Sequence, residues 1–144
     1  MIREQHYKRL EQMYLRAPVN RLYEPSISVS RGSCEVTIQI KECYLQSGKM
    51  VHGSVYFKLL DDTSYFAANS LVTDYHLLTV SYNVYFLRPA KQGILRAVGR
   101  VVNSSRRLHI AESEVFDSND KLIARGNGTF MKSAVALDEK AGYF

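Results

Sequence analysis

The feature that most constrains the fold is the segment from Val55 to Val72, which carries apolar residues on nearly every side. Its eighteen residues are too many for an ordinary strand. A helix that is apolar around most of its circumference is one that other parts of the chain cover on most sides. The segment therefore predicts a buried central helix, whose apolar residues include Tyr56, Phe57, Leu59, Leu60, Phe66, Ala67, Ala68 and Leu71.

Apolar and polar residues alternate on both sides of this segment, as in half-buried strands. Before it, residues 33–41 form one such stretch, and residues 26–31 predict a neighbouring strand that reverses at Arg31-Gly32. After it, we expect four strands, over residues 78–86, 93–102, 107–116 and 121–132. Because short turns join these four strands, they predict an antiparallel meander.

The alternation also predicts which side chains face the core. In the strand before the helix, the inward face consists of Cys34, Val36, Ile38 and Ile40. In residues 78–86, Thr79 lies on the polar face, and the apolar face consists of Leu78, Val80, Tyr82, Val84 and Phe86.

The two ends of the chain complete the prediction. Residues 3–16 are good helix formers that end before Pro18, with Leu10, Met13 and Tyr14 on one stripe. Residues 133–144 carry no pattern and are expected to fray. We therefore expect one α+β domain over residues 1–144, with its core at about 26–132. In this domain a curved antiparallel sheet of five to six strands wraps around the central helix.

Composition excludes several classes of protein. The net charge of +5 is spread without a basic run, so we expect no nucleic-acid partner. The charges fit either a solvated surface or contacts to a polyanionic ligand such as a nucleotide-bearing molecule. The longest apolar run is far short of the roughly 20 residues of a membrane span, and charges recur through Met1 to Arg21, so we expect no membrane partner, no leader and a cytoplasmic location.

The two cysteines, Cys34 and Cys43, are too few for a disulfide scaffold. We expect both to be reduced and chemically inert. The chain also lacks the paired Cys/His spacing of a structural zinc site. The sequence therefore predicts that the protein binds no metal.

The first candidate for chemistry is the pair Asp61-Asp62 within the apolar helix. A buried carboxylate costs several kcal/mol unless it is paired, hydrogen-bonded or neutralised, so its presence suggests a function. The alternative is a solvated stripe of Lys58, Asp61, Asp62 and Ser64, in which Lys58 pairs with a carboxylate three or four residues away. Position alone leaves both interpretations open.

The second candidate is His52-Gly53-Ser54, where the helix is expected to begin. His52 is either a capping residue or part of a site, and Gly53 allows another group to approach the backbone closely. The first N–H groups of a helix have no intrahelical acceptor and lie at the positive end of the helix dipole. A carbonyl oxygen bound there is polarised, and an oxyanion is held more strongly.

Several motifs together resemble the phenylacetate-pathway type of hotdog-fold acyl-CoA thioesterase. They are His52-Gly53-Ser54 followed eight residues later by Asp61, then Phe86-Leu87-Arg88-Pro89-Ala90, and finally Glu114–Asp117, Lys121–Gly126 and Gly128–Phe130. The resemblance covers roughly residues 33–132. It implies the hotdog fold, in which the sheet wraps around one long helix.

The resemblance also implies a mechanism for hydrolysis of an acyl-CoA thioester to free acid and coenzyme A. Asp61 is then the nucleophile or general base, and the Gly53 N–H polarises the thioester carbonyl. His52 helps to place the acyl-cysteamine end of the substrate, and Thr79 orients the carboxylate or water. Coenzyme A belongs to the substrate, so no separate cofactor is expected.

The sequence departs from the family pattern beside the site. Ser54 replaces a second glycine, and Gln46 stands where the family often has asparagine. We expect Ser54, Gln46 and Asp62 to contact substrate. For the coenzyme A phosphates we expect Arg88 and the preferred pair Lys91 and Arg106, which lie near predicted strand ends.

Helix geometry adds an expectation about assembly. Eight helical residues separate Gly53 from Asp61 by about 12 Å along the axis, whereas attack on a carbonyl needs roughly 3–3.5 Å. The Gly53 and Asp61 that serve one thioester should therefore come from different chains. This predicts an isologous homodimer or a homotetramer built from such dimers.

Other functions fit the same fold, because fold does not fix function. The main alternatives are a non-catalytic acyl-CoA-binding domain and a hydratase or dehydratase with His52 as base; a purely structural protein is a third. The acyl group is also open, because Tyr56, Phe57, Tyr65 and Phe66 line either an aromatic pocket or the core.

Overall fold

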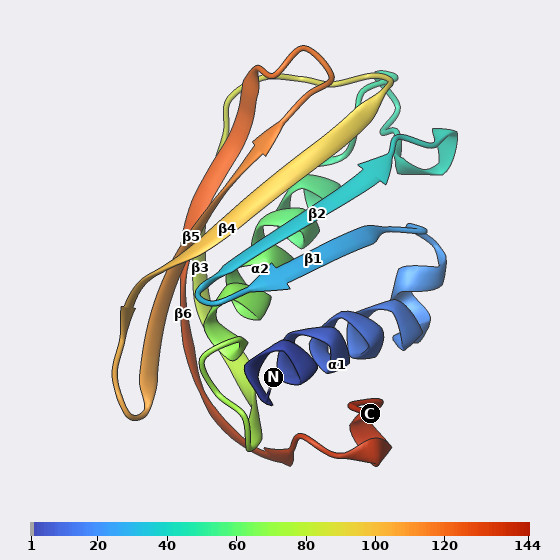
Figure 1. Cartoon of the computed structure of the whole chain (residues 1–144). Helices are drawn as coiled ribbons and strands as arrows, with labels where there is room; N and C mark the ends of the chain where they lie inside the picture. The colour runs from blue at the N-terminus through green and yellow to red at the C-terminus, as the bar shows by residue number, and fades with distance from the viewer. Residues whose placement is uncertain (1) are drawn as a thin grey trace.

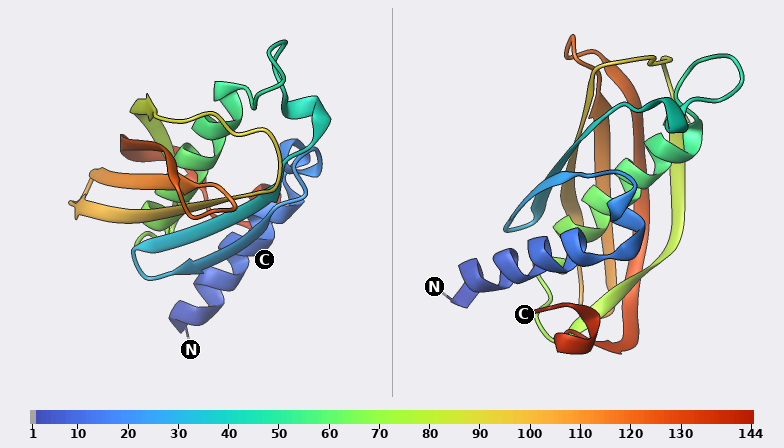
Figure 2. Two further views of the ribbon diagram at one scale, coloured as in Figure 1. Left: turned by 90° about the horizontal axis from the view of Figure 1, so that it is seen from above. Right: turned by 90° about the vertical axis from the view of Figure 1, so that its right-hand side faces the viewer.

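The computed structural model describes residues 2–144 and confirms the α+β hotdog architecture (Figure 1). One antiparallel sheet curves around the helix α2, and the helix α1 lies alongside (Figure 2). The elements are α1 (Ile2–Arg16), the 3₁₀ helix η1 (Pro18–Arg21), β1 (Ser26–Ser30), β2 (Ser33–Gln39), η2 (Glu42–Tyr44), α2 (Gly53–Asn69), β3 (Tyr75–Phe86), β4 (Ile94–Ser104), β5 (Leu108–Phe116), β6 (Leu122–Ala136) and η3 (Glu139–Ala141).

Helix α2 is buried as its composition predicts, with Leu59, Leu60 and Ala67 among its fully covered residues. It lies so close to β4 that a Cβ on Gly99 would overlap the backbone of Thr63. The helix begins at Gly53 and ends at Asn69, earlier at both ends than the expected 55–72. It begins earlier because the His52 side chain accepts a hydrogen bond from the Ser54 N–H and caps it.

The strand order corrects one expectation. The sheet runs β1-β2-β4-β5-β6-β3, so only β4, β5 and β6 form a meander. Strand β3 does not pair with β4, which follows it in sequence, but with β6, and it forms the edge of the sheet opposite β1. A long connection over residues 87–93 carries the chain across the end of α2 from β3 to β4, and this crossing lets the sheet wrap around the helix (Figure 1).

Strand β3 also differs from the predicted alternation. Leu78 and Val80 are 58% and 57% exposed, whereas Leu77 is buried. The register with β6 shifts between Thr79 and Ser81, which makes Val80 the extra residue of a β-bulge. The bulge exchanges the two faces of the strand, so that Leu77 and Thr79 before it and Tyr82 after it all face α2.

The C-terminal segment is ordered against the rest of the domain, which corrects the expectation of a frayed tail. Strand β6 continues to Ala136, beyond the expected end at 132. The Tyr143 hydroxyl lies 2.7 Å from His6 Nδ1, and the Arg16 guanidinium lies 3.8 Å from the centre of the Phe144 ring. The segment therefore packs on α1, whose predicted stripe of Leu10, Met13 and Tyr14 is buried.

Two smaller findings complete the description. Cys34 is buried and Cys43 is exposed, and both are free thiols. Within residues 2–144, no helix is both long enough and apolar enough to cross a membrane.

Candidate active site

Asp61 lies on α2 where the bulged part of β3 passes the helix. The Thr79 hydroxyl donates a hydrogen bond of 2.8 Å to Asp61 Oδ1. Burial raises the pKa of Asp61 above the ordinary value for aspartate, and the Thr79 hydrogen bond opposes this shift because it favours the charged form. The result is a partly desolvated carboxylate held in one orientation, as a base or nucleophile requires.

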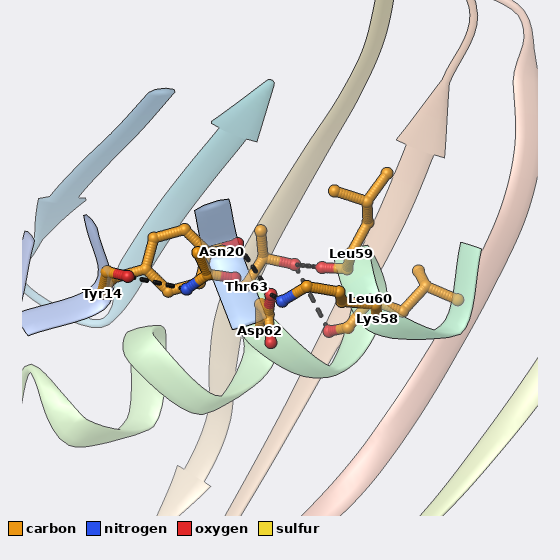
Figure 3. A network of polar contacts seen from close by, with 7 residues as sticks. All are labelled: Tyr14, Asn20, Lys58, Leu59, Leu60, Asp62 and Thr63. Atoms are coloured by element: carbon orange, nitrogen blue, oxygen red, sulfur yellow. Dashed lines mark hydrogen bonds and ion pairs between the residues drawn. The ribbon is translucent and has the colours of Figure 1, made fainter. Parts of the chain in front are cut away.

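Asp62 has different surroundings from its neighbour (Figure 3). Its Oδ2 accepts hydrogen bonds from Lys58 Nζ at 2.6 Å and from the Tyr14 hydroxyl at 2.7 Å. Burial raises the pKa of Asp62, against the lowering effects of Lys58 and Tyr14. Of the two carboxylates, Asp62 is therefore the one that forms the ion pair with Lys58 expected for a solvated stripe. This pair is mostly buried and not solvated. Asp62 joins α2 to α1, and Oδ2 is already engaged.

A cavity of about 590 Å³ opens in front of the two carboxylates. Its walls come from α2 and β3, from the end of α1 with η1, and from the C-terminal segment around Lys140–Gly142. The volume is within the range of about 300–1,000 Å³ typical of small-molecule sites. Asp61, Asp62 and Thr79 thus share one cavity.

The beginning of α2 presents one free amide. The Ser54 N–H donates to His52 Nδ1 at 3.0 Å, and the Val55 N–H donates to the His52 carbonyl. Within residues 2–144, neither a side chain nor a backbone carbonyl accepts a hydrogen bond from the Gly53 N–H. This N–H lies at the positive end of the helix. Since Nδ1 of His52 accepts, the proton of the neutral ring is on Nε2. His52 therefore caps the helix, as one interpretation of the sequence expected. Its Nε2–H remains available to donate a hydrogen bond to a ligand.

A second, smaller pocket of about 270 Å³ surrounds this amide. It is lined by Gly53, Gln46, Arg88 and Phe86. Gln46 Oε1 accepts from the Gly48 N–H and so shapes the loop before the helix. A Cβ on Gly53 would lie 3.0 Å from the ring of Phe86, so any other residue here would require this ring to shift.

Two of the expected phosphate contacts lie far apart within one chain. Arg88 and Lys91 lie in the connection before β4, and Arg106 lies in the turn after it. All three residues are exposed. The eleven residues of β4 separate Lys91 from Arg106, a span of roughly 35 Å at about 3.3 Å per residue. Lys91 and Arg106 of the same chain therefore do not meet at one phosphate.

Most of the expected site residues thus form two groups within a chain, and Lys91 and Arg106 lie outside both. Asp61, Asp62 and Thr79 share the larger cavity, whereas Gly53, Gln46 and Arg88 line the smaller pocket. His52 and Ser54 cap the helix beside the second group.

The larger cavity contains a histidine that the sequence pattern did not indicate. His76 and Tyr65 both line it, and His76 Nδ1 lies 2.8 Å from the Tyr65 hydroxyl. Burial lowers the pKa of His76. Tyr65 follows Asp61 by four residues and so shares its helix face, a signal present in the sequence. His76 gave no such signal, because the strand was expected to begin at Leu78. Within residues 2–144, no three metal-binding side chains converge.

Sequence comparison identifies the family. The family model of the thioesterase superfamily matches residues 48–124, more than half of the chain. The chain belongs to the thioesterase superfamily. Among its relatives, a Sulfurisphaera tokodaii protein named "Putative esterase" is 32% identical over 100 residues, covering 69% of this chain and 74% of that protein. A Saccharolobus solfataricus protein with the same kind of name is 25% identical over 103 residues, 72% of this chain and 69% of that one.

Several solved structures share the fold. The PaaI protein of the E. coli phenylacetic acid degradation operon matches with a TM-score of 0.85 at 20% identity, over 94% of this chain and 99% of that chain. A thioesterase family protein from Silicibacter pomeroyi matches with a TM-score of 0.81 at 23% identity, over 88% and 96% of the two chains. The same sheet wrapped around one helix therefore recurs in these proteins.

Proposed function

We propose that this thioesterase superfamily member hydrolyses acyl-CoA thioesters to a carboxylic acid and coenzyme A. Family membership supports a thioester hydrolase in general, and the geometry around Asp61 supports the more specific proposal. The observation that carries it is a partly desolvated carboxylate, fixed by Thr79, at a cavity large enough for an acyl group. Exposed basic residues near the strand ends suit the coenzyme A phosphates.

In the proposed reaction, Asp61 either attacks the thioester carbonyl or removes a proton from a water that attacks it. The Gly53 N–H, at the positive end of α2, donates to the carbonyl oxygen and holds the negative charge that develops there. Collapse of the tetrahedral intermediate expels the thiolate of coenzyme A. In the general-base route this releases the acid directly, and the proton held by Asp61 passes to the thiolate; in the nucleophilic route water then hydrolyses the acyl–Asp61 anhydride to the acid and restores the carboxylate. His52, through Nε2–H, is suited to contact the amide-bearing arm next to the sulfur.

The two groups of residues would meet across a homodimer. Within one chain, Phe86 lies against Gly53 and Thr79 lies against Asp61, near opposite ends of β3. Strand β3 is an edge of the sheet, and an edge strand offers unpaired backbone groups to another chain. If two copies pair antiparallel through β3, with Thr79 opposite the partner's Phe86, then Asp61 faces the partner's Gly53. This dimer has two equivalent sites.

The direct test is thiol release from a panel of acyl-CoAs by the wild type and by Asp61→Asn. The substitution keeps the size of the side chain and removes its charge, so we expect turnover to fall at least about 100-fold. Asp120→Asn is the matched control, because Asp120 is an exposed aspartate outside both pockets, and it should retain the activity of the wild type. Equal turnover by wild type and Asp61→Asn would refute the assignment, and binding of acyl-CoA without turnover by the wild type would favour the non-catalytic alternative.

The shared site is tested by mixing two inactive proteins. Asp61→Asn chains and Gly53→Val chains each lack one half of every site in their own homodimers. A mixed dimer contains one site with both halves intact, so subunit exchange should restore up to about half of the activity of one dimer. No recovery, with exchange proven by mass-tagged chains, would place both halves in a single chain.

A further inference from the structure

The segments around the end of α2 enclose a further cavity, of about 840 Å³. It lies away from the pocket at Gly53, and its walls are the loop from α2 to β3, the turn from β4 to β5 and the last part of β6 (Figure 1). The lining consists of residues 71–75, 104–107, 109 and 131–134, which together we call the basic pocket. We propose that the basic pocket binds the phosphate group of a small molecule other than the substrate.

The charge of the basic pocket favours an anion. Arg106, Arg107 and Lys132 line it, and among the described residues of the lining Asp74 alone is acidic. None of the three cations takes part in an ion pair within residues 2–144. Arginine and lysine donate charge-assisted hydrogen bonds to phosphate oxygens. A solvated surface can carry the same cations, so the buried part of the lining is decisive.

His109 supplies a buried polar atom without a partner. The residue is 3% exposed, and its Nδ1 lies 2.6 Å from the Ser104 hydroxyl oxygen. Its Nε2 is buried and forms no hydrogen bond within residues 2–144. When the Ser104 hydroxyl donates to Nδ1, the proton of the neutral ring is on Nε2, which then requires an acceptor. A phosphate oxygen is such an acceptor, and it would remove the cost of leaving this atom unpaired.

The position of His109 on β5 explains why it lines the basic pocket. Alternate residues of β5 face inward, and Ser113 among them donates to the Leu60 carbonyl of α2. Ala111, the next inward residue toward the turn, shares a buried cluster with Ala68 in the last part of the helix. His109 follows beyond the end of α2, where the cavity takes the place of the helix.

An anion reaches Nε2 of His109 only after a lining side chain turns aside, because this atom has almost no exposed surface. Arg106, Arg107 and Lys132 are long and exposed, so they can change rotamer without disturbing the core. Lys132 Nζ lies 4.5 Å from the centre of the Tyr75 ring, another part of the lining. We therefore expect the three cations to close over a phosphate that has His109 at its base.

The basic pocket is separate from the candidate active site. None of its residues lines the cavity at Asp61 or the pocket at Gly53. Strand β3 begins between the two larger cavities, with Tyr75 on the basic pocket and His76 on the cavity at Asp61. A substrate held at Asp61 would therefore have to extend around this strand to reach Arg106. The volume exceeds that of phosphate and lies in the range of about 300–1,000 Å³ for small-molecule sites, so the rest of a small phosphorylated molecule fits as well.

The direct test is calorimetric titration with inorganic phosphate, at constant ionic strength set with chloride. We expect saturable binding to a single site per chain. Arg106→Gln combined with Arg107→Gln should weaken this binding at least about tenfold, because the change removes charge-assisted hydrogen bonds. Arg21→Gln combined with Arg125→Gln is the matched control and should bind phosphate like the wild type, since both arginines are exposed and lie outside the basic pocket.

Two variants of His109 distinguish a ligand contact from a structural role. His109→Leu removes the unpaired buried atom, so the fold should keep its stability while phosphate binding weakens at least about tenfold. His109→Gln places an amide donor near the position of Nε2 and should restore part of the affinity. Thermal unfolding checks that both variants are folded.

NMR gives a readout at His109 itself. Its Cε1–H signal is identified by its absence from the spectrum of His109→Gln, and phosphate should shift this signal in the wild type. Burial lowers the pKa of His109. Arg106, Arg107 and Lys132 of the lining also disfavour the charged ring, whereas Asp74 favours it. A bound phosphate favours the charged ring, so the midpoint of the His109 titration should move to higher pH.

Failure of the wild type to bind phosphate saturably would overturn the proposal, as would an equal loss of affinity in the two double variants. A His109 signal that stays unchanged at saturating phosphate would place the anion elsewhere and reject the basic pocket. Displacement of the bound phosphate by coenzyme A would assign the basic pocket to the substrate and reject a separate ligand. None of these measurements depends on hydrolysis, so they decide the proposal whether or not the proposed function holds.

Discussion

At the scale of single residues, Asp61 and Asp62 show how two adjacent carboxylates acquire different roles on one helix. A helix turns about 100° per residue, so the two side chains face different neighbours. Asp62 meets the Lys58 ammonium from its own helix and the Tyr14 phenol from α1, whereas among residues 2–144 Asp61 accepts a side-chain hydrogen bond from Thr79 alone and faces the cavity. The charge of Asp62 is therefore compensated by an ion pair, and the charge of Asp61 is the one that the proposed function uses.

The pH dependence of hydrolysis follows from these contacts. Asp61 must be ionised to act, so kcat/KM should fall as pH drops through the raised pKa of Asp61. The Thr79 hydrogen bond stabilises the ionised form, so its loss in Thr79→Val raises this pKa further. We therefore expect the acidic limb of the profile to move to higher pH in Thr79→Val.

The profile is measured with one acyl-CoA across the acid range, and Thr79→Ser, which keeps the hydroxyl, is the control. An acidic limb at the same pH in Thr79→Val and the wild type would show that the hydroxyl does not act on the ionising group. A shift in Thr79→Ser as large as that in Thr79→Val would show that loss of the hydroxyl is not the cause of the effect.

At the scale of elements, a hydrogen bond from α1 to α2 ends on a mostly buried ion pair within α2. The side chains of Lys58 and Asp62 are 16% and 17% exposed, and Tyr14 of α1 donates to the same oxygen. Removing one partner of a buried pair leaves an uncompensated charge, at a typical cost of about 3 kcal/mol. Lys58→Met should lower the free energy of unfolding by about this amount at neutral pH.

The loss in Lys58→Met should depend on pH in a defined direction. Burial already raises the pKa of Asp62 in the folded state, and removing Lys58 raises it further. A raised folded-state pKa means that the folded protein binds the proton more readily than the unfolded chain. Destabilisation should therefore shrink as pH falls from about 7.5 to about 5.

Urea unfolding of the wild type and Lys58→Met at several pH values measures this, and Lys91→Met, at an exposed lysine, is the matched control. A loss of stability in Lys58→Met that stays constant across this range would show that Asp62 is not the group responsible.

The elements themselves were largely predictable from the sequence, because each long segment keeps one period. The central helix follows directly from its apolar pattern, and β2, with buried Cys34, Val36 and Ile38, follows from its alternation. The bulge at Val80 did not follow, because Leu77, Leu78 and Val80 are equally apolar and the pattern fits either face. The order of the C-terminal segment was also not predictable, since it depends on tertiary contacts such as Arg16 with Phe144.

The candidate site was predictable only in part. The family motifs indicated Asp61, Gly53 and Thr79, and the Thr79–Asp61 hydrogen bond is present. The partner of Asp62 was open, because Lys58 precedes Asp61 by three residues and Asp62 by four, and both spacings allow contact. The sequence did not predict His76 as a site residue, because its contact with Tyr65 depends on where β3 begins.

At the scale of the whole molecule, the apolar edge at β3 is the surface expected to hold two copies together. Val80 is 57% exposed on this edge, and Val102 on β4 is equally exposed. Because a buried unpaired charge is costly, Val80→Arg should separate the dimer and reduce acyl-CoA hydrolysis at least about tenfold. Sedimentation and thiol release measure the two effects.

Val102→Arg carries the same change at the same exposure and is the matched control for Val80→Arg. It should keep both the assembly and the activity of the wild type if the β3 edge forms the dimer. Dissociation by Val102→Arg alone would place the interface on the convex face of the sheet. An active monomer of Val80→Arg would contradict the shared site.

The position of β3 has a consequence for how the protein is made. A chain leaves the ribosome from its N-terminus, so residues 75–86 emerge well before residues 122–136, which form their only strand neighbour in the sheet. Until β6 has been made, β3 has no partner strand to join it to the sheet. The contact of Thr79 with Asp61 and the strand edge that would recruit a second copy are thus completed together, by the arrival of β6.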